Sequence, residues 1–251
     1  MKNNGVPTIF DAHRRQLRRL RATRSQDSTK SADYILADMI DDVRDRLDFM
    51  QMSEGRAAVL GDLTGRGASE LRGRGFTVEE PGPGTLDEEA PWPLPPCDLI
   101  VSLGTLDTLN DLPGALLHMR AGLTDRGLYI AQMLGAGSLP VLRQVMLAAD
   151  ADSPAARIHP QVDNRSSAAL LQRAGFKSQV VDARSLTVRY SRFETLVGDL
   201  RDQALTGVLA DYPPPLSKAA LARAHAVFDA MREDDGKVTE TFQILALTGW
   251  R

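Results

Sequence analysis

The residues best suited to chemistry lie in a glycine-rich turn that follows a short apolar segment, 57–60. The turn has the sequence Gly61-Asp62-Leu63-Thr64-Gly65-Arg66-Gly67, and a helix-compatible stretch and a second strand, ending in Glu79 and Glu80, come after it. Glycines let a backbone pass close to a ligand, and the N–H groups at a helix start can meet a polar or anionic group. A strand-end carboxylate can accept hydrogen bonds from a ribose diol. This order indicates a nucleotide-type binding unit, with an ordinary turn and solvated acids as the alternative.

Other candidate side chains lie further along the chain. His159, before Pro160, could act as a base or bind a substrate, with a purely structural histidine as the alternative. Arg143 could meet an anionic group, although exposed arginines are common. Tyr190 stands at a strand end, where it could contact a substrate or pack at the sheet edge. Cys97 is the single cysteine, and no histidine is near it in sequence, so we expect neither a nucleophile nor a Cys-clustered metal site.

The elements that must position these residues alternate along the chain. Apolar, β-rich segments predict strands at 57–60, 75–80, 98–103, 127–133, 176–190 and 241–247. Helical patterns lie between them, with a helix capped by Asn110 or Asp111 and others at 68–74, 139–149, 166–174, 193–205 and 216–231. Alternating strands and helices predict an α/β fold with a mostly parallel sheet covered on both faces. The helical insertion before the last strand predicts an antiparallel pair that closes the sheet.

The segment 32–49 is predicted to be an amphipathic helix. Ile35, Met39, Val43 and Leu47 recur four residues apart and place one apolar stripe inward. The charged residues between them are expected to face water: Asp38, Asp41, Asp42, Arg44, Asp45 and Arg46.

The segment 81–97 contains six prolines, which exclude a helix and a central strand. We expect an extended surface loop, long enough to indicate that a regular element has been replaced there.

The N-terminal segment is strongly basic. Six arginines lie within residues 14–24, and Asp11 is the acid near them. Three interpretations remain open: a solvated helical arm, an electrostatic contact for an acidic partner or nucleic acid, and an organelle transit peptide. We expect a basic arm at 1–30 and one domain at 31–251, with a helical cap at 191–235.

The composition sets the broad class. The chain has 251 residues, a formal net charge of −3 and 43% hydrophobic residues, enough to fill a sizeable core. The near-neutral charge argues against a general nucleic-acid binder. No apolar run approaches the roughly 20 residues that a membrane-spanning helix needs, and no apolar signal region lies near Met1. We therefore expect a soluble, cytoplasmic protein without a transmembrane segment.

Several motifs together resemble a known family. In the first half they are Phe10-Asp11 with the arginines through Arg21-Ala22, Asp33-Tyr34, Asp98-Leu99-Ile100-Val101-Ser102 and the run Leu109 to Leu116. In the second half they are Gly127 to Met133 with Gly135, Leu139 and Arg143, Ile158-His159-Pro160, Arg173-Ala174-Gly175-Phe176, Leu186 to Tyr190, Asp199-Leu200-Arg201 and Thr248-Gly249-Trp250. Over nearly its full length the chain resembles the Rossmann-like class I S-adenosylmethionine-dependent methyltransferase superfamily. Within it, the chain is most similar to the complex I assembly factors of mitochondria described as arginine hydroxylases, and less so to malonyl-carrier methyltransferases.

The resemblance implies a three-layer sandwich with S-adenosylmethionine at the carboxyl ends of the strands. The cofactor-binding residues it implies are Gly61, Asp62, Gly65, Gly67, Glu80, Asp87, Ser102 and Leu103. It implies a protein substrate or assembly partner in respiratory complex I assembly, with His159, Arg143 and Tyr190 as substrate contacts, and it identifies no catalytic residue.

The cofactor end departs from the superfamily's pattern of an acid followed by alternate glycines. Gly65 and Gly67 match the last two glycines, but Leu63 stands where the first should be, and its side chain would crowd the methionine portion of the cofactor. The proline-rich segment stands where the superfamily has a helix and its third strand, and Asp107-Thr108 replaces a pair that would line the cofactor. We therefore expect a sheet shortened at one edge and weak or absent cofactor binding. A non-catalytic assembly or binding protein is the alternative function.

Overall fold

The structure, a computed structural model, describes residues 8–28, 30–152 and 154–251. Its centre is one six-stranded sheet with the strand order β2-β1-β3-β4-β6-β5. The strands are β1 (Gly55–Leu60), β2 (Phe76–Glu79), β3 (Cys97–Leu103), β4 (Leu123–Leu134), β5 (Lys177–Tyr190) and β6 (Val238–Trp250). Strands β1 to β4 pair in parallel, whereas β6 is antiparallel to both β4 and β5. The predicted mostly parallel sheet, closed by an antiparallel pair, is confirmed.

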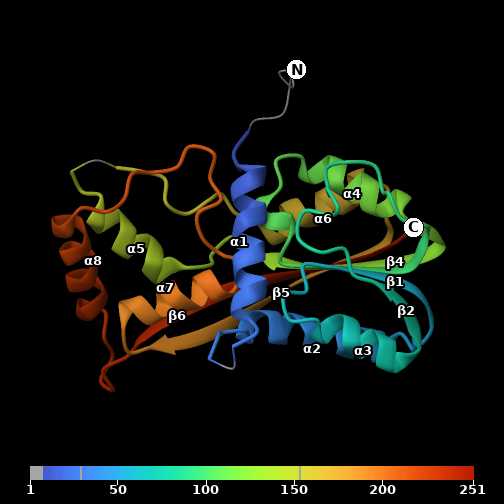
Figure 1. Cartoon of the computed structure of the whole chain (residues 1–251), viewed down its shortest axis with the longest axis horizontal. Helices are drawn as coiled ribbons and strands as arrows, with labels where there is room; N and C mark the ends of the chain where they lie inside the picture. Colours follow the sequence, from blue (N-terminus) through green and yellow to red (C-terminus); the bar gives the residue numbers. More distant parts are fainter. Residues whose placement is uncertain (1–7, 29, 153) are drawn as a thin grey trace.

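Helices cover both faces of this sheet (Figure 1). They are α1 (Ala12–Ser25), α2 (Tyr34–Phe49), α3 (Arg66–Arg74), the short 3-10 helix η1 (Leu106–Thr108), α4 (Leu112–Ala121), α5 (Pro140–Ala149), α6 (Asn164–Arg173), α7 (Phe193–Asp202) and α8 (Lys218–Ala230). Successive strand residues point to opposite faces. Ala57 and Val59 of β1 join the core shared with α2 and α3, while Ala58 and Leu60 join the core shared with α4 and α6. The result is the expected three-layer sandwich.

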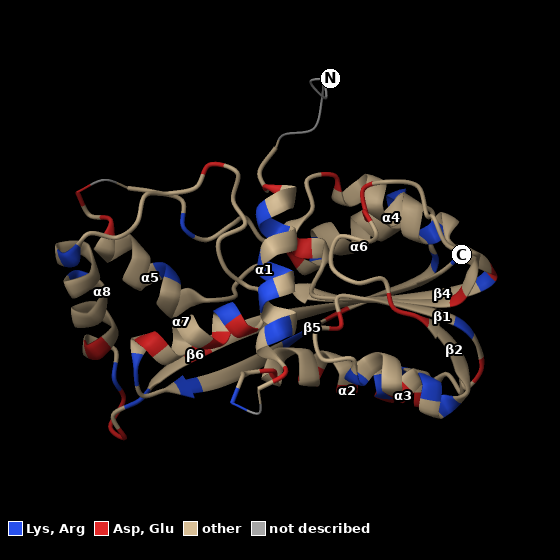
Figure 2. Cartoon of the chain, in the orientation of Figure 1, with Lys and Arg blue, Asp and Glu red and all other residues tan. Residues whose placement is uncertain are grey.

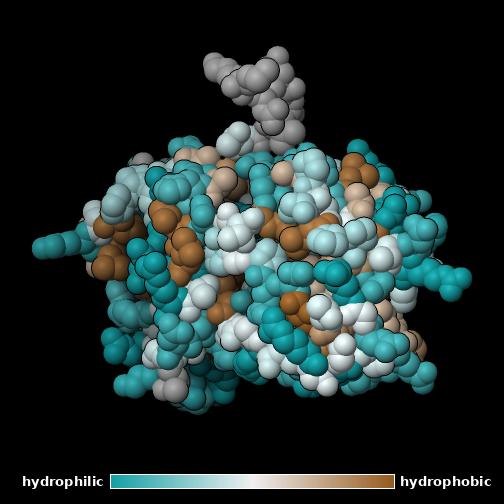
Figure 3. All heavy atoms as spheres, turned by 45° about the vertical axis from the view of Figure 1, so that its right-hand side comes forward, coloured by the Kyte–Doolittle hydropathy of each residue, from teal (hydrophilic) through white to brown (hydrophobic). Residues whose placement is uncertain are grey.

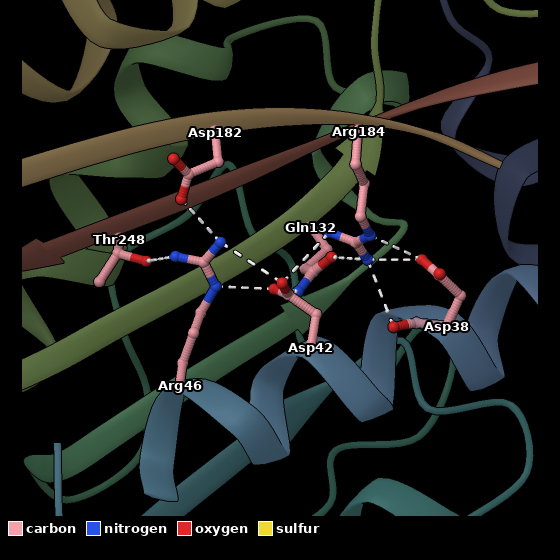
Figure 4. Close-up of polar contacts among 7 residues, drawn as sticks. All are labelled: Asp38, Asp42, Arg46, Gln132, Asp182, Arg184 and Thr248. Atoms are coloured by element: carbon pink, nitrogen blue, oxygen red, sulfur yellow. Dashed lines mark hydrogen bonds and ion pairs between the residues drawn. The ribbon is translucent and has the colours of Figure 1, made fainter. Parts of the chain in front are cut away.

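Helix α2 shows the predicted apolar stripe, because Ile35, Met39, Val43 and Leu47 are all buried. The prediction that its charged residues face water is wrong for three of them. Figure 4 shows Asp38, Asp42 and Arg46 in one polar network with Gln132 of β4, Asp182 and Arg184 of β5, and Thr248 of β6.

Two arginines carry most of this network. Arg46 donates to Asp42 at 2.7 Å and to Asp182 at 2.8 Å, and Arg184 donates to Asp38 at 2.6 Å. These charged residues are withdrawn from water because β4, β6 and β5 extend beneath α2 and present polar side chains to the helix face beside its apolar stripe. The network fixes α2 against three strands.

The sheet is shortened at the edge formed by β2. The chain between β2 and β3 contains neither helix nor strand over residues 80–96. This agrees with the predicted extended loop and with the predicted loss of a strand. The loop folds back toward α1, since Gln16 lies against Gly84 and Arg15 pairs with Glu88.

The other end of the molecule carries α5, α7 and α8 beside the long antiparallel pair of β5 and β6 (Figure 1). The helices predicted at 193–205 and 216–231 exist but are shorter. Helix α7 ends at Asp202, and Ala204 then adopts a φ of 60°, outside the right-handed helical region. Helix α8 begins after Ser217, whose hydroxyl accepts from the N–H of Ala220 at 3.1 Å.

The cap of α4 is Asp111 and not Asn110. The Asp111 carboxylate accepts from the N–H of Gly114 at 2.9 Å. Asn110 instead holds the segment before α1, because its side chain accepts from the N–H of Phe10 at 2.9 Å and donates to the Phe10 carbonyl at 3.0 Å. This contact joins positions 100 residues apart and fixes where α1 begins.

The surface is mixed in character. Figure 2 shows basic residues recurring along α1, and Figure 3 shows apolar residues in separate patches between polar ones on the displayed face. Within the described ranges, no helix combines the length and apolar character needed to cross a membrane.

Candidate functional site

A cavity of about 370 Å³ lies at the carboxyl ends of β1, β2 and β3. Helix α1 forms one wall and the proline-rich loop the other, and the turn after β1 forms the floor. Four of the predicted cofactor-binding residues line this cavity: Gly61, Asp62, Glu80 and Asp87. In open parallel sheets, ligands bind outside the carboxyl ends of the strands, so this is the place where the fold positions a ligand.

The turn after β1 needs glycine at its first position. Gly61 has a φ of 81°, and a Cβ atom there would lie 2.1 Å from the carbonyl oxygen of Leu103 and 2.5 Å from the Thr105 side chain. The turn therefore packs directly on the end of β3. Leu63 lines the cavity, so its side chain is in a position to crowd the methionine portion of a bound cofactor.

Asp62 is used within the turn. Its Oδ1 atom accepts from the backbone and hydroxyl of Thr64 at 3.1 and 3.0 Å, and its Oδ2 atom accepts from the N–H of Ala68 at 3.0 Å. Gly65 starts α3 with a φ of 71°, and Gly67 leaves room for the Asp62 carboxylate, since a Cβ atom there would lie 3.2 Å from it. Gly65 and Gly67 shape the turn and do not line the cavity.

The acids at the far end of the cavity also have partners. Glu80 forms an ion pair with Arg72, and the Asp87 carboxylate accepts from the N–H of Glu89 at 3.0 Å. Glu79, the neighbouring candidate, pairs with Arg56 at 3.3 Å and does not line the cavity.

Ser102 and Leu103 lie in the interior. The Ser102 hydroxyl is fully buried and accepts from the Tyr129 hydroxyl at 3.1 Å, on the α4 side of the sheet. The Leu103 side chain is buried on the opposite side, and its carbonyl meets Gly61. The residues that reach the large cavity from this strand come later, at Thr105.

Two arginines of α1 reach the site, and the sequence interpretation did not single them out. Arg15 pairs with Glu88 at 2.7 Å and donates to the Thr108 hydroxyl at 2.9 Å and the Thr105 carbonyl at 3.0 Å. Arg19 donates to the Gly104 carbonyl. Their spacing of four residues places both on one helix face, which is the signal in the sequence that could have identified them.

A small polar cavity of about 10 Å³ lies beneath these arginines, with Asp107 and His159 in its wall. The His159 Nε2 atom is 3.6 Å from the Asp107 Oδ2 atom, and the two side chains are only 10% and 2% exposed. Both carboxylate oxygens of Asp107 and the His159 Nε2 atom lack a hydrogen-bond partner among the described residues. Buried polar groups normally have partners, so this cavity is suited to a water molecule or a small polar group.

The structure does not bring the other two substrate candidates to this place. Arg143 is exposed on α5, and Tyr190 hydrogen-bonds the Tyr34 hydroxyl at the end of β5; neither lines a cavity described above. Burial raises the pKa of Tyr34 to about 12. Of the three candidates, only His159 lines one of these cavities, the small one beneath Arg15 and Arg19.

In the described ranges, no group of three or more His, Cys, Asp and Glu side chains is arranged to hold a metal ion.

The chain is similar to two groups of curated proteins. It is 31% identical over 160 residues to "Arginine-hydroxylase NDUFAF5, mitochondrial" of Mus musculus, covering 61% of this chain and 46% of the relative. It is 27% identical over 154 residues to "Malonyl-[acyl-carrier protein] O-methyltransferase" of Xylella fastidiosa, covering 61% of this chain and 51% of the relative. The chain thus spans about half the length of these two relatives. No protein-family model matches it.

The mouse relative corrects one expectation. We expected a cytoplasmic protein, but this relative and its counterparts in zebrafish and human are labelled mitochondrial. The cytoplasmic expectation is wrong, because it depended only on the absence of apolar targeting segments.

Among solved structures, 1,6-didemethyltoxoflavin-N1-methyltransferase of Burkholderia thailandensis aligns with a TM-score of 0.45 at 13% identity, over 85% of this chain and 78% of that one. The order of the strands in this chain and its similarity to both groups of curated relatives support its placement in the class I S-adenosylmethionine-dependent methyltransferase superfamily.

Proposed function

We propose that this protein binds S-adenosylmethionine in the 370 Å³ cavity and works as a methyltransferase-like protein on a protein substrate in respiratory complex I assembly. The observation that carries the proposal is the position of the cavity. It opens at the carboxyl ends of three parallel strands, beside the turn with Gly61, and its volume lies in the usual range of small-molecule sites.

The residues present suit the parts of this cofactor. Glu80 and Asp87 stand at the loop end of the cavity, where their carboxylates could accept from ribose hydroxyls and an adenine amine. Gly61 and Leu63 lie under the middle. When bound, the cofactor supplies a methyl group on an activated sulfonium. The chain then has to orient the acceptor and exclude water, and it needs little acid–base chemistry for this.

The names of the relatives support a protein partner. The arginine-hydroxylase relatives and the carrier-protein methyltransferase relatives both carry names that describe action on an amino-acid residue or on a carrier protein. A macromolecular substrate is therefore the class we assign to this chain.

A second function is favoured by one observation, the internal use of the site's acids. Asp62 binds Thr64 and Ala68, Glu80 binds Arg72, and Asp87 binds the Glu89 backbone. A ligand must displace or share these contacts. If these contacts prevent the cofactor from binding, the chain serves complex I assembly as a non-catalytic binding protein with the methyltransferase fold.

Titration calorimetry with S-adenosylmethionine and S-adenosylhomocysteine distinguishes the two functions. Saturable binding of one ligand per chain supports the first, and no heat at millimolar ligand supports the second. Two neighbouring acids provide matched variants. Glu80→Gln should weaken binding because Glu80 lines the cavity, whereas Glu79→Gln, which also removes one ion pair, should leave it unchanged.

A further inference from the structure

Arg19 occupies the point where three cavities meet. It lines the 370 Å³ cavity, the 10 Å³ cavity with Asp107 and His159, and a third cavity of about 30 Å³ beside Leu63 and Gln203. Each cavity lies near the carboxyl ends of β1 and β3. A side chain in this position can contact a ligand in any of the three cavities.

The Arg19 guanidinium has donors to spare. Its Nη2 atom donates to the Gly104 carbonyl, and no other hydrogen bond links its guanidinium to the residues that the structure describes. No carboxylate of those residues lies within 4.0 Å of it. Arg15, one turn earlier, differs, since it has Glu88 as an ion-pair partner at 2.7 Å. Arg19 therefore faces the cavities with a positive charge that has no ion-pair partner within 4.0 Å in the described residues.

Burial makes this charge costly. Burial, together with the charge of the neighbouring Arg15, lowers the pKa of Arg19 to about 10, although the charges of Glu88 and Asp107 oppose this shift. The guanidinium still carries its proton at neutral pH. Arg19 is half-buried, and a cation removed in part from water without a close counter-ion is unfavourable, so an anionic group in the cavity would stabilise it.

The glycine-rich turn uses part of its own donors internally. A helix start usually offers free N–H groups, but the N–H groups of Thr64 and Ala68 already donate to Asp62. Gly61 faces the Leu103 carbonyl. On this side of the cavity, α1 therefore provides the charged donors for a carboxylate, beside the N–H groups that remain in the turn.

We propose that Arg19 binds the α-carboxylate of the methionine portion of the cofactor, so that α1 supplies the charged anchor for that end of the ligand. This inference rests on the function proposed above. Guanidinium and carboxylate match in geometry and form two parallel charge-assisted hydrogen bonds. The opposite end of the cavity, with Glu80 and Asp87, is left for the ribose and adenine.

Two probes that differ only in the amino-acid portion test this role. S-adenosylhomocysteine has the α-carboxylate, and 5′-methylthioadenosine lacks the whole amino-acid end. We would titrate the full chain and its Arg19→Gln variant with each probe by calorimetry. The variant should bind S-adenosylhomocysteine about tenfold more weakly or worse and 5′-methylthioadenosine as well as the parent does. Arg21→Gln is the matched control, because Arg21 is an exposed arginine of the same helix.

The outcomes separate this inference from the proposed function. If the parent chain binds neither probe, both are wrong. If it binds both and Arg19→Gln weakens them equally, or weakens neither, the cofactor proposal stands and the assignment of Arg19 is wrong. Arg19→Lys keeps the charge and a donor for the Gly104 carbonyl. If Arg19→Gln does not fold, this variant is used to compare binding of S-adenosylhomocysteine with binding of 5′-methylthioadenosine. It should restore part of the lost S-adenosylhomocysteine affinity and leave 5′-methylthioadenosine binding unchanged.

Discussion

His159 Nε2 lies 3.6 Å from Asp107 Oδ2, which joins the loop after α5 to the 3-10 helix after β3. The pair is almost wholly buried, and the ring of Phe10 packs edge-on against the imidazole with centroids 5.6 Å apart. The distance is longer than a hydrogen bond, so the Asp107 carboxylate is left without a donor in the described chain. A buried carboxylate without a donor costs folding free energy.

The first prediction concerns this cost. Asp107→Asn removes a buried negative charge and keeps the shape of the side chain, so the free energy of unfolding should rise by about 1–3 kcal/mol. Urea denaturation measures the change. Asp111→Ala is the control of opposite sign, because it removes the cap of α4 and should cost about 1 kcal/mol. A loss of stability in Asp107→Asn would show that the carboxylate has a strong electrostatic partner, such as the Arg19 guanidinium.

The second prediction concerns the attachment of α1. Arg15 and Glu88 form an ion pair at 2.7 Å with side chains 16% and 6% exposed. A double-mutant cycle with Arg15→Met and Glu88→Gln should give a coupling free energy above about 1 kcal/mol, because little solvent screens the pair.

The control for this cycle is the pair of Arg44 and Asp41. It has the same 2.7 Å separation, but its side chains are 41% and 54% exposed. Its coupling should stay below about 1 kcal/mol. Equal coupling in the two cycles would mean that α1 is not held by its buried pair.

The third prediction concerns Leu63, which stands in the cavity wall. Leu63→Gly should strengthen S-adenosylhomocysteine binding several-fold if its side chain crowds the methionine portion. Calorimetry with 5′-methylthioadenosine provides the control, since that ligand has no methionine portion to crowd. Unchanged binding of S-adenosylhomocysteine, or an equal gain for both ligands, would remove the explanation by crowding.

The fourth prediction concerns pH. Glu240 is fully buried and accepts from the N–H of Leu142 at 2.8 Å at the start of α5. Burial raises its pKa above the ordinary value of about 4.3, although these hydrogen bonds act in the other direction. The folded state thus binds a proton there more tightly than the unfolded state does. The contribution of Glu240 to stability is full below the ordinary pKa and declines as the pH rises through the raised one.

Comparison with Glu240→Gln isolates this effect, because the variant cannot titrate there. The unfolding free energy of the parent chain minus that of the variant should fall as the pH rises above the ordinary glutamate pKa of about 4.3. A difference that does not change with pH would show that Glu240 has the same pKa in both states.

Local patterns predicted much of the fold. The apolar run around Leu99 and Val101 predicted a buried strand, and the four-residue recurrence from Ile35 to Leu47 predicted the buried face of α2. These predictions hold because burial follows the period of each element. The polar flank of α2 was mispredicted, since the partners Asp182 and Thr248 come from strands more than 130 residues later.

The site was predicted less well, for two physical reasons. Strand alternation sends the Ser102 and Leu103 side chains into the two cores, so the strand reaches the cavity only at Thr105. The arginines of α1 meet the site through contacts such as Arg19 to Gly104, which span 85 residues, so their local spacing predicts a shared helix face but not what that face contacts. Gly61 and Asp62 line the cavity because the turn follows its strand directly, and their contact with a cofactor stays a prediction.

The central claim is that the cavity between α1 and the proline-rich loop holds the cofactor. A crystal structure of the chain with S-adenosylhomocysteine tests it most directly. The account predicts the ligand at the carboxyl ends of β1, β2 and β3, with its ribose near Glu80 and its carboxylate on Arg19. A ligand bound elsewhere, or an empty cavity at millimolar ligand in the crystal, would contradict it.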